Sequence, residues 1–125
     1  MADIQAKLQA LSEEFTKLQQ DLQDTVQSRQ KLEAQMQENL GVKKEFSNLK
    51  EGEAIYKLIG PVLLKQETTE AESTVKGRLE FIEKEISRLE SHIKEMQGKM
   101  EKKKGEIIQL QTSAQAAAPQ AVRAQ

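Results

Sequence analysis

The sequence predicts a mainly α-helical chain, a long antiparallel two-helix coiled coil with one β-hairpin between the helices. Apolar residues recur in steps of three and four along two long polar stretches, which is the heptad pattern of coiled coils. Between them, two apolar runs flank Gly60-Pro61, a pattern typical of two short strands joined by a tight turn. The expected segments are a first helix over 1–51, a hairpin over 52–67, a second helix over 68–113 and a flexible Ala- and Gln-rich tail over 114–125.

The central hairpin has two apolar faces. A turn at Gly60-Pro61 places Ile59 opposite Val62 and Lys57 opposite Leu64. A hairpin lying on one surface should alternate apolar with polar residues, and a lone two-stranded hairpin is marginally stable in water. We therefore expect the hairpin to bind neighbours that the chain does not supply. The candidate interface residues are Ile55, Tyr56, Leu58, Ile59, Gly60, Pro61, Val62, Leu63 and Leu64.

The first arm has a heptad seam with two polar positions, Thr25 and Arg29. These form either a tolerated polar layer or a layer that sets the register. Gly52 is placed to end the helix. The predicted seam residues are Ile4, Leu8, Leu11, Phe15, Leu18, Leu22, Thr25, Arg29, Leu32, Met36, Asn39, Val42, Phe46 and Leu49.

The second arm has a more regular seam, interrupted only by Lys103. Thr69 and Glu72 have the spacing of a capping box at its start. Folding at the hairpin brings Phe46 beside Val75 and keeps the two seams in step, although a slip of half a heptad is also compatible with the pattern. The seam comprises Val75, Leu79, Ile82, Ile86, Leu89, Ile93, Met96, Met100, Lys103, Ile107 and Leu110.

The composition excludes several classes of protein. Charged residues make up 31% of the chain with a net charge of −1, and basic and acidic residues are interleaved, so no nucleic-acid or membrane partner is expected. The chain has no cysteine, no apolar N-terminal signal and no stretch of membrane-spanning length, and we expect a soluble intracellular protein.

No catalytic, cofactor-binding or metal-binding constellation is predicted. His92 is the only histidine, and it flanks the second seam without the partners that acid–base or metal chemistry requires. The Glu and Lys residues alternate along helix faces, as solvating charges do. We therefore expect a protein that is not an enzyme and uses no cofactor.

The ends of the two arms carry apolar residues in a structure only two helices thick. Seam residues there stay partly exposed, and Ile108 lies off the seam. The cluster either packs the two helices together or contacts a non-native chain. Its residues are Ile4, Leu8, Leu11, Phe15, Ile107, Ile108 and Leu110.

Three segments resemble the β class of prefoldin subunits. The hairpin run from Tyr56 to Gln66 is the specific part of the resemblance, although Leu64 stands where Val is more familiar. The run from Arg29 to Gln35 resembles the first helix of that family. The second helix is matched by Glu70-Ala71, Thr74-Val75, Arg78-Leu79, Ile82 and Glu85-Ile86. The similarity spans about residues 4 to 112.

The resemblance implies a hetero-hexamer of two α-class and four β-class subunits whose hairpins close into a shared β-barrel. Its partners would be the other prefoldin subunits, unfolded clients such as actin and tubulin, and the cytosolic chaperonin, to which clients pass without ATP. The implied location is the cytoplasm. A structural coiled-coil scaffold or tether is the alternative; it explains the heptads but not the apolar hairpin.

Overall fold

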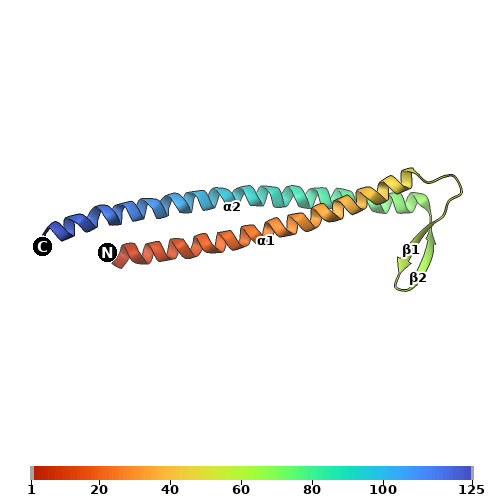
Figure 1. Ribbon diagram of the computed structural model, residues 1–125. Coiled ribbons are helices and arrows are strands. Elements are labelled where there is room, and N and C mark those ends of the chain that lie inside the picture. The colour runs from red at the N-terminus through yellow and green to blue at the C-terminus, as the bar shows by residue number, and fades with distance from the viewer. Residues whose placement is uncertain (1, 125) are drawn as a thin grey trace. The chain divides into compact units, whose positions relative to one another are not determined.

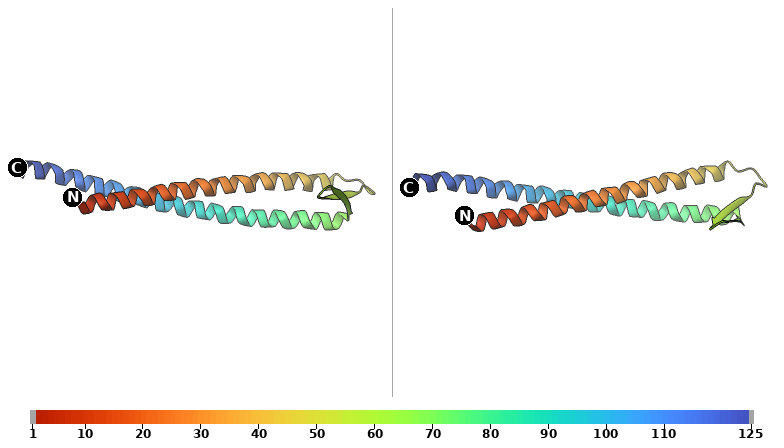
Figure 2. Two further views of the ribbon diagram at one scale, coloured as in Figure 1. Left: turned by 90° about the horizontal axis from the view of Figure 1, so that it is seen from below. Right: turned by 60° about the horizontal axis from the view of Figure 1, so that its bottom comes forward.

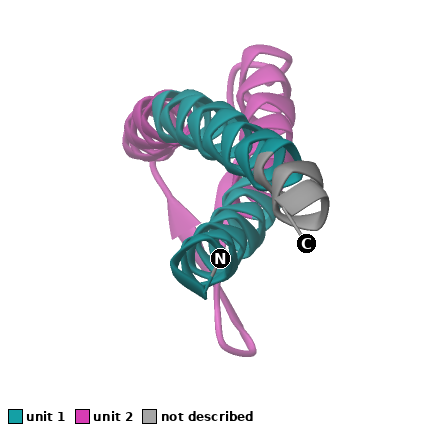
Figure 3. Cartoon of the chain, turned by 90° about the vertical axis from the view of Figure 1, so that its left-hand side faces the viewer, with its two compact units in different colours: residues 1–27, 90–125 teal, residues 28–89 magenta. Residues whose placement is uncertain are grey.

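The computed structural model describes residues 2–124, and they form two compact units (Figure 3). Unit 1 contains residues 2–27 and 90–124, and unit 2 contains residues 28–89. The elements in chain order are α1 (Ala2–Ser47), β1 (Ile55–Ile59), β2 (Val62–Gln66) and α2 (Thr68–Ala124) (Figure 1). The predicted fold class, two long helices with one hairpin between them, is confirmed.

The core of unit 2 is a seam between α1 and α2, which lie side by side in that unit (Figure 2). Its buried residues all come from α2: Ala71, Val75, Leu79, Ile82, Ile86 and Leu89. From α1, the predicted seam residues are half-buried, apart from Val42. The prediction for Val42 was wrong, because its side chain is 41% exposed. The seam spacing from Met36 to Asn39 to Val42 is two three-residue steps in succession, which rotate the seam around the helix.

The hairpin has the predicted register. β1 and β2 pair antiparallel with Ile59 opposite Val62 and Lys57 opposite Leu64. Gly60 has a φ of 58° in the turn, a left-handed conformation that glycine adopts without steric cost. The pleat therefore sets Ile59 and Leu58 on opposite faces of the hairpin.

Two helix boundaries differ from the prediction. α1 ends at Ser47 rather than near Gly52, and the last turn tightens as the Asn48 and Leu49 amides donate to the Glu45 and Phe46 carbonyls, three residues back (3.1 and 3.2 Å). Gly52 instead occupies a turn in the connection, with a φ of 88°. α2 begins at Thr68, and the Ala71 amide already donates to the Glu67 carbonyl (3.0 Å), so Glu67 rather than Thr69 holds the cap position.

Unit 1 packs the start of α1 against the C-terminal part of α2 (Figure 2). Met96 is its one buried residue among those whose side chains the structure describes, and the other seam residues are half-buried. Lys103, the polar seam position, reaches out to form an ion pair with Glu14 of α1. α2 extends to Ala124, past the predicted boundary at 113. Residue 125, the end of the predicted tail, lies outside the described residues.

Candidate subunit interface and helix ends

The hairpin exposes apolar side chains on both faces. Leu58 is 68% exposed and Leu63 63%, and they stand opposite each other on one face. On the other face, Ile59 and Val62 are about half exposed, at 50% and 51%. Tyr56 and Leu64 are exposed as well, whereas Ile55, at the base of β1, is half-buried. Gly60 and Pro61 form the exposed turn.

Both outer edges of the hairpin are unpaired, because β1 and β2 form a two-stranded sheet with no further strand among the described residues. An unpaired edge presents backbone N–H and C=O groups that can bind a strand from another chain. The hairpin thus combines two apolar faces with two open edges. The structure places the predicted interface residues together on this single element.

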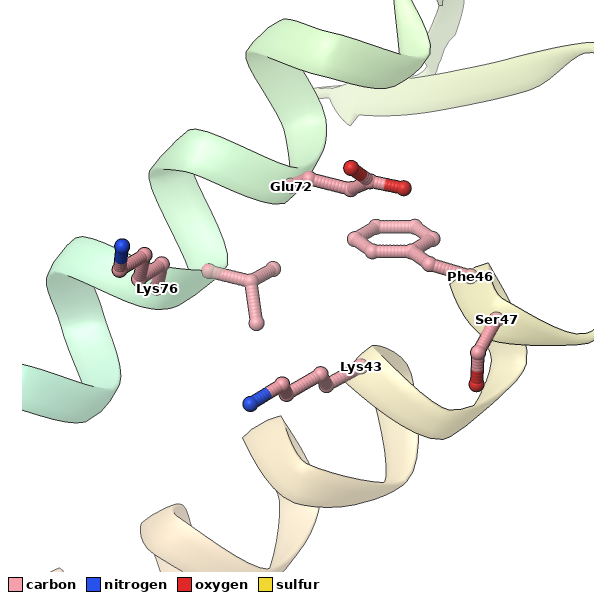
Figure 4. Close-up of a pocket in the computed structure, with 6 residues that line it drawn as sticks. Lys43, Phe46, Ser47, Glu72 and Lys76 are labelled. Carbon is pink, nitrogen blue, oxygen red and sulfur yellow. The ribbon is translucent and has the colours of Figure 1, made fainter.

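Unit 2 has a groove that sequence reasoning missed. It has a volume of about 290 Å³ and lies between the end of α1 and the start of α2. Figure 4 shows the Phe46 ring projecting from α1 towards α2 beside the Glu72 carboxylate, while Lys43 extends across the same space. A second hollow links Phe46 to the base of the hairpin at Ile55 and Gln66. The end of the seam at Phe46 thus lies beside the base of the hairpin.

The predicted cluster at the helix ends is brought together in unit 1. A groove of about 460 Å³ runs between Leu11 of α1 and Leu110 of α2, with polar residues such as Lys7 and Glu106 along it. Ile108 is 52% exposed outside the seam. The remaining members of the cluster are half-buried: Ile4, Leu8, Leu11, Phe15, Ile107 and Leu110. These side chains keep accessible apolar surface.

Titratable groups form local pairs on the helix surfaces. Arg88 donates to the Glu85 carboxylate (2.9 Å), which lowers the pKa of Glu85 and raises that of Arg88. His92 lies 3.9 Å from a Glu95 oxygen, measured from Nδ1. Within residues 2–124 no three His, Cys, Asp or Glu side chains gather in a way that could hold a metal ion. None of the helices in this range is long and apolar enough to cross a membrane.

The fold and the exposed hairpin define a class of protein, a two-helix coiled coil that carries a solvent-exposed β-ribbon. The family model described as prefoldin subunit matches residues 9–114. Prefoldin subunit 6 of Saccharomyces cerevisiae is 44% identical over 109 residues, covering 87% of this chain and 96% of that protein. Prefoldin subunit 6 of Homo sapiens is 44% identical over 114 residues, covering 91% of this chain and 88% of that protein.

The solved structures agree with the sequence matches. A crystal structure of the prefoldin beta subunit from Thermococcus strain KS-1 superposes with a TM-score of 0.75 at 26% identity, covering 81% of this chain and 89% of that one. This chain belongs to the prefoldin subunit family and is a subunit of a prefoldin co-chaperone. Membership in this family of subunits implies a hetero-oligomer with other prefoldin subunits.

Proposed function

We propose that this chain is a β-class subunit of a prefoldin hexamer of two α-class and four β-class subunits, in which its hairpin joins a shared β-barrel. The complex acts in the cytoplasm as a holdase without ATP or another cofactor. It captures unfolded clients such as actin and tubulin at the helix ends and passes them to the cytosolic chaperonin.

The exposed hairpin is the observation that carries this proposal. Six of its apolar side chains are 49–68% exposed in the single chain. Fully burying one such side chain contributes about 1.5–3 kcal/mol, so covering one apolar face of the hairpin already stabilises an assembly. A barrel formed with neighbouring hairpins would cover the inward face and pair both open edges at once.

The helix ends support the client-binding part of the proposal. Unfolded chains expose apolar side chains, and a binding surface for them must offer apolar contacts without a fixed shape. The half-buried cluster in unit 1 has this character, since Leu11 and Leu110 line an open groove and Ile108 is exposed beside it.

The test replaces Ile59 and Val62, the closing pair of the hairpin, with Asp. The expected result is loss of assembly with the other prefoldin subunits while the helices stay folded, because two carboxylates cannot enter an apolar barrel. Native mass spectrometry measures assembly and circular dichroism measures helix content.

The control is Phe81→Asp, which introduces one carboxylate at an exposed apolar residue outside the hairpin (63%, against 50% for Ile59 and 51% for Val62). This variant should assemble as the wild type does. Normal assembly of the Ile59→Asp, Val62→Asp variant would refute the barrel. A wild-type chain that forms only a self-dimer would favour the scaffold alternative instead.

A further inference from the structure

The hairpin carries uncompensated positive charge on both of its faces. Residues 55–66 contain two lysines, Lys57 and Lys65, and no Asp or Glu. Lys57 stands opposite Leu64 and Lys65 opposite Tyr56, which sets the two lysines on opposite faces of the pleat. Both side chains are exposed, and neither forms an ion pair with another residue in the described part of the chain.

A strand that pairs with an open edge of the hairpin must face one of these lysines. Residues directly opposite each other on adjacent strands have Cβ atoms about 4.5–5.5 Å apart, close enough for opposite charges to stabilise the pair and like charges to destabilise it. The long lysine stem can lie along the apolar face while the ammonium group seeks a partner near it. The chemistry that suits each position is therefore a carboxylate.

With its strands fully overlapped, a second copy of this chain places no carboxylate opposite these lysines, because residues 55–66 contain no Asp or Glu. Antiparallel overlap of the full β1 strand with β1 of another copy, centred on the five residues Ile55–Ile59, sets Lys57 directly against Lys57. When β1 meets β2 of a copy in the register of the hairpin itself, Lys57 meets Leu64 and again finds no anion. The strands of a closed sheet of copies would carry two positive charges per chain and no negative one, and the lysine on the inward face would be covered without an anionic partner, which is costly.

We propose that the strands pairing with this hairpin belong to different prefoldin subunits and place carboxylates beside Lys57 and Lys65. Charge complementarity then selects mixed assembly over assembly of copies, as like charges on edge strands do elsewhere. The inference rests on the proposed function, because it assigns the chemistry of the partner strands at the same hairpin.

The experiment reconstitutes the complex from the full chain and the other prefoldin subunits of the same organism. The test variant is Lys57→Glu with Lys65→Glu, and the control variant is Lys84→Glu with Lys102→Glu, which makes the same change in net charge at exposed positions on α2. The affinity of each variant for the other prefoldin subunits is measured by titrating the variant into them at low and at high salt. The test variant should bind the other subunits on the order of tenfold more weakly than the wild type at low salt. Added salt should reduce this difference in affinity.

A neutral polar variant, Lys57→Gln with Lys65→Gln, tests whether the lysines prevent pairing between copies of this chain. Sedimentation of this full chain alone should show self-association at lower concentration than the wild type, because the repulsion between copies is gone while the apolar faces remain. Self-association equal to that of the wild type would overturn the claim that the lysines prevent this hairpin from pairing with a second copy.

The outcomes separate this inference from the proposed function. If the Asp variant of Ile59 and Val62 fails to assemble but the Glu variant of the lysines assembles like its control, the hairpin is the interface and charge selection is wrong. If neither variant affects assembly, both proposals are wrong. A selective, salt-sensitive loss in the Glu variant supports both.

Discussion

Two adjacent residues on α2, Phe81 and Ile82, should differ strongly in how much stability is lost when each is truncated to Ala. Ile82 is 5% exposed in the seam, whereas Phe81 is 63% exposed on the outer surface of the helix. Ile82→Ala removes three carbons, worth about 2.4 kcal/mol at about 0.8 kcal/mol for each buried methylene. The residual cavity adds to that loss, within the range of about 2–5 kcal/mol for such truncations.

Phe81→Ala should change stability by no more than about 0.5 kcal/mol, because it removes little buried area. The change can even be stabilising, since Ala has the higher helix propensity. Urea denaturation followed by circular dichroism measures both variants against the wild type, and the expected gap of about 2 kcal/mol is a roughly 30-fold difference in the unfolding equilibrium. Equal losses in the two variants would refute the assigned seam.

The ends of the helices give two further predictions. Removing the residues before Leu11 and after Lys104 should spare assembly but weaken the ability of the complex to suppress aggregation of denatured actin, as measured by light scattering. Equal suppression by the truncated complex would contradict the proposal that the helix ends bind clients. The Glu14 carboxylate raises the pKa of Lys103, so their ion pair stabilises the fold below the ordinary lysine value of 10.5 and is lost as pH rises above it. The wild type should therefore be more stable than Glu14→Gln below pH 10.5 and lose this advantage above it, as urea midpoints would show.

The hairpin and the seams could be predicted because local chemistry decides them. Gly60 supplies the left-handed turn residue, and the two apolar runs then fix the register from Ile59 and Val62 outward. The seams follow from apolar residues spaced three and four apart, and the buried residues of α2 have this same spacing. Such patterns need no knowledge of distant contacts.

The helix boundaries and the groove could not be predicted in the same way. The helix ends at Ser47, where the backbone tightens into bonds between residues three apart at Asn48 and Leu49, rather than at Gly52. The groove around Phe46 depends on how far apart the two helices stand, which a heptad pattern does not encode. Burial concentrated on α2 likewise reflects packing rather than composition, since both seams are rich in Leu and other large apolar residues.

The two open strand edges have a consequence for the supply of this chain in the cell. A copy made in excess of its partners keeps both edges and the exposed pair Leu58 and Leu63 available to any extended segment it meets. Such an orphan is a template for aggregation and a substrate for proteolysis. Its useful lifetime depends on how quickly the other subunits are synthesised, which ties the dosage of this chain to theirs.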